Sequence, residues 1–81
     1  MAKRRKIPAM SSNKLVKILE RAGASFDRWG KGDHAIYKRE VGGKLYKAPV
    51  LQGKKELPPE YSLIVFRQLA ISDDEINDLL R

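Results

Sequence analysis

The sequence predicts an α+β fold in which one helix, three antiparallel strands, a second helix and a short third helix follow one another. Apolar residues recur at helical spacing near both ends of the chain, and the segment between them alternates apolar and polar residues between glycine turns. The chain has 81 residues, which suits one small domain with one core. We therefore expect the two longer helices to pack on one face of a three-stranded antiparallel sheet.

The N-terminal segment shows no periodicity, and Pro8 discourages a helix there. Residues 1–6 carry four basic side chains and no acidic one. We interpret residues 1–10 as a basic flexible tail and residues 11–81 as a single domain. The tail is either a solvated arm or a contact to nucleic acid.

The first helix is expected over residues 13–22. Ser11 or Ser12 is a suitable N-cap, and Gly23 suits the position just after the helix end. One side of this helix carries apolar residues at spacings of three and four: Leu15, Ile18, Leu19 and Ala22.

Three strands are expected next, because the apolar period changes and short glycine turns interrupt the segment. Pro49 fits only a strand end or an edge strand. The expected strands are residues 25–29, 34–40 and 44–50, joined by turns at 30–33 and 42–43.

The second helix is expected to begin at Pro58-Pro59, since proline is tolerated in a first helical turn. Residues 61–70 are mostly apolar, so this helix should be largely buried. Ser72 and Glu75 match a capping box, which predicts a short last helix with acidic residues in its first turn.

The charge of the chain favours a polyanionic partner. It has 17 lysines and arginines against 10 acidic residues, a formal net charge of +7. Residues 7–72 are basic in their own right, so the tail alone does not produce this charge. Nucleic acid is the first candidate, with salt-dependent binding, and an acidic protein is the second.

Several kinds of chemistry are excluded by composition. The chain has no cysteine and one histidine, so a disulfide framework, a thiolate metal site and a two-histidine catalytic pair cannot form within it. The acidic residues at 73–78 match no familiar metal-ligand spacing, and we expect no metal and no cofactor. No targeting segment or membrane-length apolar run is visible, so we expect a cytoplasmic protein with no membrane partner.

The order αβββα on a basic chain is the layout of double-stranded RNA-binding domains. In detail, residues 12–80 resemble the HicA family of small toxins, RNA-cleaving enzymes that block translation in type II toxin–antitoxin systems. The resemblance rests on the "KLxKxLExAG" pattern of residues 14–23, the turn Gly32-Asp33-His34, a proline-containing third strand before "GKKEL", and a helix ending "RQLAIS" with acidic residues after it.

This resemblance implies that His34 is the catalytic residue of a metal-independent mRNA interferase and that Gly32 holds the turn that positions it. It also implies mRNA as substrate and a HicB-type antitoxin as protein partner. The chain departs from the family pattern at Asp33, Ala35 and Gln52, where the family often has serine, histidine and histidine, and at Glu60-Tyr61, where it often has Gly-Thr.

Taken without the resemblance, His34 is either an ordinary surface residue beside a glycine turn or a general base for attack by the RNA 2′-hydroxyl. Asp33 fits a turn-stabilising role better than a catalytic dyad, because adjacent strand residues face opposite sides of a sheet. Five cations are candidates for phosphate contacts, or else solvated charges: Arg28, Lys31, Arg39, Lys54 and Lys55.

Two further questions stay open at this stage. Trp29, Tyr37 and Tyr46 either stack on bases or belong to the core. The alternative to an RNA-cleaving toxin is a non-catalytic module that binds RNA or protein on the same fold.

Overall fold

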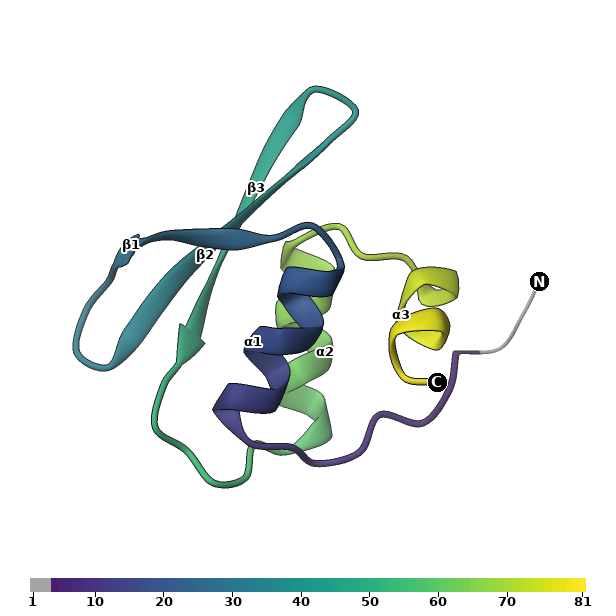
Figure 1. The fold of residues 1–81 in the computed structure, drawn as a ribbon, viewed down its shortest axis with the longest axis horizontal. Coiled ribbons are helices and arrows are strands. Elements are labelled where there is room, and N and C mark those ends of the chain that lie inside the picture. The colour runs from purple at the N-terminus through teal and green to yellow at the C-terminus, as the bar shows by residue number, and fades with distance from the viewer. Residues whose placement is uncertain (1–3) are drawn as a thin grey trace.

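The computed structural model describes residues 4–81 and confirms the α+β fold class (Figure 1). A helix is followed by a three-stranded antiparallel sheet and then by two helices, and the strand order is β1-β2-β3. The elements are α1 (Ser12–Arg21), β1 (Ser25–Trp29), β2 (His34–Val41), β3 (Lys44–Leu51), α2 (Pro59–Gln68) and α3 (Asp73–Leu79).

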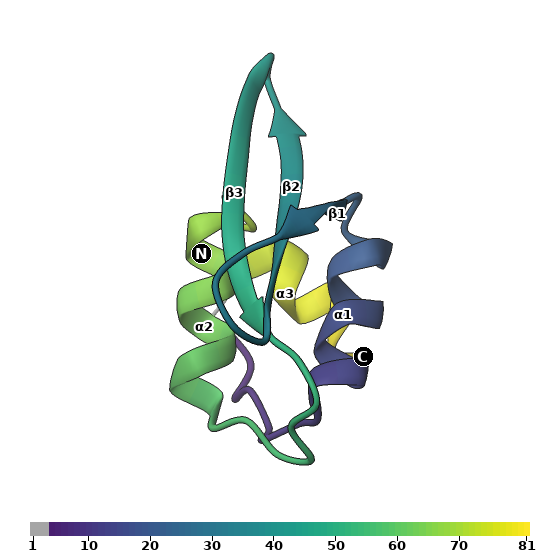
Figure 2. The same ribbon diagram turned by 90° about the vertical axis from the view of Figure 1, so that its left-hand side faces the viewer.

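The helices cover one face of the sheet. Ala35 and Tyr37 of β2 and Ala48 and Val50 of β3 are buried, and these alternate residues all point to the helical side. α1 and α2 lie side by side behind the sheet, and α3 lies farther from it (Figures 1 and 2). The opposite face, which we call the uncovered face, is turned toward the viewer in Figure 2. By alternation it carries His34, Ile36 and Lys38 of β2 and Lys47, Pro49 and Leu51 of β3.

Both longer helices end in the same backbone motif, in which the residue after the C-cap takes a left-handed conformation. Gly23 does so after α1 with φ +91°, as the sequence predicts, and Ala70 does so after α2 with φ +57°. The amide of the following residue then bonds back into the last helical turn, from Ala24 to the Leu19 carbonyl and from Ile71 to the Phe66 carbonyl.

The helix starts follow the expected capping residues. Ser11, rather than Ser12, caps α1, because its side chain accepts a hydrogen bond from the Lys14 amide. Ser72 and Glu75 form the predicted capping box at the start of α3. The expected burial of α2 is only partly correct, because Ser62, Val65 and Phe66 are buried while Ile64 is 57% exposed.

The assignment of residues 1–10 to a flexible tail needs correction. Ile7 and Met10 are each only 3% exposed and belong to the core, and Met10 pairs with Leu57 in an antiparallel bridge. Lack of periodicity excluded a helix there but not an extended segment whose apolar side chains fill the core. The domain therefore extends to at least Ile7, and residues 1–3 lie outside the described part of the chain.

The β2–β3 hairpin projects beyond the helices (Figure 1). Its turn is Gly42-Gly43, and both glycines have positive φ, which other residues rarely adopt. Within residues 4–81, no helix has the length and apolar character needed to cross a membrane.

Candidate nucleic-acid interface and catalytic residue

His34 is the first residue of β2 and lies half-buried on the uncovered face. Its Nδ1 is 3.1 Å from the carbonyl oxygen of Lys31. A carbonyl can only accept a hydrogen bond, so Nδ1 carries the proton in this contact. In the neutral ring the lone pair then resides on Nε2, which is the form that a general base requires.

The β1–β2 turn fixes the position of this ring. The Gly30 amide donates to the His34 carbonyl at 2.7 Å, and the His34 amide donates to the Lys31 carbonyl at 3.2 Å. Gly32 has φ +60°, in the left-handed region that favours glycine. At Gly30 a Cβ would lie 2.9 Å from Cδ1 of Ile36, so a larger residue there would require the flexible end of that side chain to shift. The structure thus places Gly32 where it can position His34, and Gly30 contributes to the same turn.

The loop between β3 and α2 lies directly beside this turn. His34 pairs with Leu51 in the sheet, and the Gln52 amide donates to the Asp33 carbonyl at 2.9 Å. Asp33 therefore helps to hold the turn through its backbone. Two segments far apart in the sequence, one with Lys31 and one with Lys54, flank His34.

Ser12 holds this loop against α1 and was not singled out from the sequence for that role. It is 1% exposed, and its hydroxyl donates to the Leu51 carbonyl at 2.7 Å and accepts from the Lys54 amide at 3.0 Å. Its own amide donates to the Lys54 carbonyl at 3.0 Å. The backbone of Lys54 is thereby fixed while its side chain stays exposed, as does that of Lys55.

Arg28 lies on β1 opposite Ile36, and its side chain is 67% exposed. It belongs to a cluster around Asp27, which sits at an irregularity of strand pairing. The carboxylate of Asp27 lies 3.2 Å from Lys47, 3.9 Å from Lys38 and 3.8 Å from Arg28. The contact with Lys47, followed in importance by the charges of Arg28 and Lys38, holds the pKa of Asp27 below 3.8 despite partial burial.

Lys38 and Lys47 are two cations of the uncovered face that the sequence analysis did not select. The signal was available, because Lys38 has the same strand parity as His34. Lys38 and Lys47 are paired across β2 and β3, and this pairing follows from the position of the turn at Gly42-Gly43.

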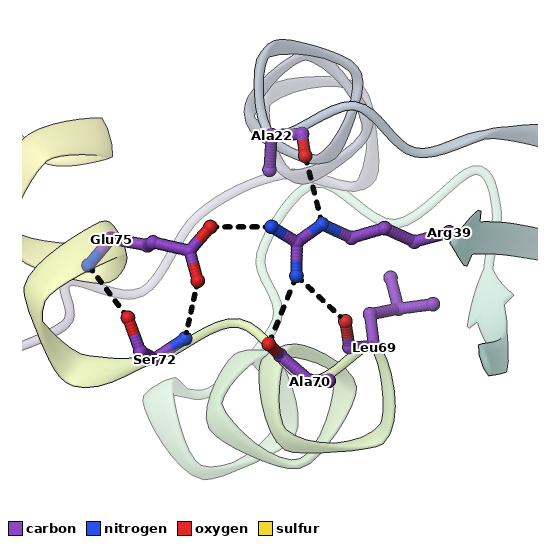
Figure 3. A network of polar contacts seen from close by, with 6 residues as sticks. All are labelled: Ala22, Arg39, Leu69, Ala70, Ser72 and Glu75. Atoms are coloured by element: carbon purple, nitrogen blue, oxygen red, sulfur yellow. Dashed lines mark hydrogen bonds and ion pairs between the residues drawn. The ribbon is translucent and has the colours of Figure 1, made fainter. Parts of the chain in front are cut away.

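Arg39 is the one candidate cation that the structure removes from the interface. Its side chain is only 10% exposed and points to the helical side of the sheet. The guanidinium donates to the carbonyls of Ala22, Leu69 and Ala70 at 2.8, 3.0 and 2.9 Å and pairs with Glu75 (Figure 3). These carbonyls belong to the C-terminal ends of α1 and α2, which lack partners within their own helices. Arg39 therefore caps two helices and is not free to bind phosphate.

The three aromatic candidates fall into different places. Tyr37 is buried in the core, and burial raises its pKa. Tyr46 is half-buried at the far end of the sheet, opposite Arg39. Trp29 is 65% exposed at the end of β1, with the ring of Phe26 packed against it edge-on at a centroid distance of 5.7 Å. Of the three, Trp29 is the one exposed enough to stack on a base, but its pairing with Ala35 puts it on the face of the sheet opposite to His34.

A shallow pocket of about 290 Å³ lies between the β1–β2 turn and the loop that follows β3. It is lined by Trp29, Asp33, Gln52, Gly53 and Lys54. Within residues 4–81, no group of three or more histidine or acidic residues is arranged to hold a metal ion.

Together, the fold and the site define a small basic α+β domain that carries one imidazole at the end of an uncovered sheet. No protein-family model, no curated protein and no solved structure matches this chain. The functional conclusion therefore depends on the chemistry of the site and on the sequence resemblance.

Proposed function

We propose that this protein is a metal-independent endoribonuclease that cleaves mRNA, the toxin of a type II toxin–antitoxin pair of the HicA type. The observation that carries the proposal is the state of His34, whose Nδ1–H is held by the Lys31 carbonyl and whose Nε2 is left as a base. Exposed lysines on two adjacent segments, Lys31 and Lys54, can contact the phosphates on either side of a bound ribose. The likeness of residues 12–80 to HicA proteins supports the same conclusion.

The chemistry requires one base and one acid. Nε2 of His34 takes the proton of the 2′-hydroxyl, and the 2′-oxygen attacks the adjacent phosphorus. The bond from phosphorus to the 5′-oxygen breaks, and this oxygen takes a proton from water or from a nearby lysine. The products are a 2′,3′-cyclic phosphate and a 5′-hydroxyl. Lys31, Lys54 and Lys55 stabilise the additional negative charge of the phosphorane.

The test is paired expression of the wild-type protein and His34→Ala without an antitoxin. We expect the wild-type protein to arrest growth and shorten mRNA, and we expect the substitution to abolish both effects while the circular dichroism spectrum stays unchanged. Lys17→Ala, an exposed position on α1, is the matched control and should remain toxic. Equal toxicity of wild type and His34→Ala, or none from either, contradicts the proposal.

Purified protein separates this function from the alternative, a non-catalytic module that binds RNA or protein. The alternative is favoured by the exposed cations around Asp27, which offer a binding face without catalytic groups. It predicts that the wild-type protein retards RNA in a gel without shortening it. The proposed toxin also predicts that a co-expressed HicB-type antitoxin restores growth and copurifies with the protein.

A further inference from the structure

Three cations of the sheet converge on one partly buried carboxylate, that of Asp27. The distances from nitrogen to carboxylate oxygen are 3.8 Å for Arg28, 3.9 Å for Lys38 and 3.2 Å for Lys47. The side chain of Asp27 is 17% exposed, against 43% for Lys38 and 39% for Lys47. The cations therefore face the solvent more than the carboxylate does, and one carboxylate balances only one of their three charges. We call Arg28, Lys38 and Lys47 the basic cluster.

The basic cluster shares the uncovered face with His34. His34 and Lys38 lie four positions apart on β2, so they point to the same side of the sheet. Lys47 is the register partner of Lys38, and Arg28 is the register partner of Ile36. At about 3.3 Å per residue, His34 and Lys38 are about 13 Å apart along the strand. A chain of phosphates that follows β2 can therefore meet the imidazole at one point and the basic cluster at another.

Within the described strands, the uncovered face has no phenylalanine, tyrosine or tryptophan ring on which a base can stack. The aromatic residues of the sheet have the register of the helical side: Phe26 pairs with Tyr37, Trp29 with Ala35 and Tyr46 with Arg39. Sheets that read the bases of RNA do so by stacking them on such rings. Contacts on the uncovered face are therefore directed at phosphates, which carry no sequence information.

The basic area has a limited extent. Glu40 is the next residue of β2 with the same parity as Lys38, and it is exposed. Its negative charge ends the basic area before the hairpin turn. In the other direction the area ends at His34 and the exposed Lys31 beside it. An acidic protein would also complement the basic cluster, but its position on the same face as the imidazole favours the substrate of that imidazole, a polyanionic strand.

We propose that the basic cluster binds phosphates of the RNA strand that flank the scissile bond, so that the substrate crosses the uncovered face from His34 to Lys38 and Lys47 and is held there by its backbone without selection of bases. The inference rests on the proposed function and extends that site along β2. A distance of about 13 Å corresponds to about four nucleotides of a stacked strand, at about 3.4 Å each, and to fewer of an extended one. The substrate must therefore continue for several nucleotides beyond the cut on one side.

The binding test uses the full-length His34→Ala protein, which cannot cleave under the proposed mechanism, and a labelled single-stranded decaribonucleotide followed by anisotropy. Each phosphate contact of a single strand contributes about 0.7 to the slope of log K against log salt concentration. The double substitution Lys38→Gln and Lys47→Gln should therefore reduce the slope by about 1.4 and weaken binding about 10- to 30-fold at about 0.1 M salt. Arg28→Gln, at a position that is 67% exposed, should reduce the slope by about 0.7 without disturbing the fold.

The matched control makes the same change of charge on the other side of the molecule. Lys14→Gln together with Lys17→Gln removes two exposed lysines of α1 and should change the slope by less than about 0.3. An unchanged slope in the cluster variants, or an equal change in the α1 control, overturns the proposal.

Two further measurements test how the strand is held. The cluster substitutions should weaken the binding of decamers of A, C and U by the same factor, within about twofold, because phosphates are alike in all three. In the protein that keeps His34, the same substitutions should lower kcat/KM for a decamer about tenfold and leave that for a dinucleotide unchanged, since a dinucleotide at His34 is too short to reach the cluster. Unequal factors for the three decamers, or an equal loss for dinucleotide and decamer, contradicts the proposed path of the strand.

The outcomes separate this inference from the proposed function. If the wild-type protein cleaves RNA and the cluster variants bind and cleave the decamer equally well, the cluster assignment is wrong and the ribonuclease proposal stands. If the cluster variants lose the expected salt dependence but the wild-type protein never cleaves, RNA binding by the cluster stands and the ribonuclease proposal is wrong. If the cluster variants lose a HicB-type antitoxin while their affinity for RNA is unchanged, the cluster binds protein and the inference is overturned.

Discussion

Replacing Arg39 by methionine removes the group on which the ends of two helices converge. The guanidinium donates to the carbonyls of Ala22, Leu69 and Ala70 and pairs with Glu75 of α3 (Figure 3). Methionine keeps much of the aliphatic packing but donates no hydrogen bond. The three carbonyls then lose their partners in a part-buried site.

The size of the effect follows from the exposure of the groups. A hydrogen bond from a charged donor contributes about 1.5–3 kcal/mol, and the three are not additive. Arg39 is 10% exposed, so its charge is shielded from water, but Glu75 is 43% exposed, so the ion pair itself contributes about 1 kcal/mol or less. We expect Arg39→Met to lower the free energy of unfolding by about 3–5 kcal/mol. For comparison, the free energy of unfolding expected for a domain of 81 residues is about 4–12 kcal/mol in total.

Urea unfolding followed by circular dichroism measures this loss, with Arg39→Lys and Glu75→Gln as companions. Lysine keeps the charge but lacks the planar fork of donors, so we expect it to recover less than half of the loss. Glu75→Gln should cost about 1 kcal/mol or less. The reasoning is refuted if Arg39→Lys matches the wild type, or if Glu75→Gln costs as much as Arg39→Met, because either result would show that charge rather than carbonyl capping is decisive.

Three further predictions concern single contacts. Burial favours a raised pKa for Glu75, but hydrogen bonds from Ser72 and the charge and hydrogen bond of Arg39 outweigh it and hold the pKa below 4.5. Glu75 therefore stabilises the fold fully above that pH and loses its contribution as the pH falls through the lower folded-state pKa. When urea midpoints are compared at pH 7 and about pH 3, Glu75→Gln should lose less stability than the wild type. An identical loss in both proteins would contradict this. Ser12→Ala removes the two hydroxyl contacts to the β3–α2 loop. We expect the free energy of unfolding to fall by about 1–3 kcal/mol and hydrogen exchange at the Lys54 amide to become faster. Unchanged exchange would show that the loop is held by other contacts. Ala70→Gly relieves the left-handed strain after α2 and should stabilise the protein by about 1 kcal/mol in thermal unfolding. Gly23→Ala after α1 should destabilise it by a similar amount. An effect of the same sign in both variants would count against the strain argument.

Much of the fold could be predicted because its signals are local. The helix face at Leu15, Ile18 and Leu19, the end signal at Gly23 and the capping box at Ser72 each depend on residues within one or two turns of each other. The burial of Ile7 and Met10 could not be read in this way, because an extended segment with two apolar residues has no periodicity to detect.

The candidate site was predictable only in part. His34 and Gly32 share one turn, so the sequence alone places them together. The approach of Lys54 to that turn depends on strand pairing and on Ser12, a residue 42 positions away from Lys54. Sequence reasoning could therefore name the lysine but not the clamp that holds it.

The sequence by itself determined the order of the elements, the turns, the helix caps and the supply of positive charge, because these depend on neighbouring residues and composition. Only the tertiary structure decided what each cation does. Arg28 and Arg39 are the same residue type on adjacent strands, yet Arg28 is 67% exposed and Arg39 is 10% exposed. The partners of Arg39 lie 17, 30, 31 and 36 residues along the chain, and a contact over such separations exists only once the helix ends have been brought together.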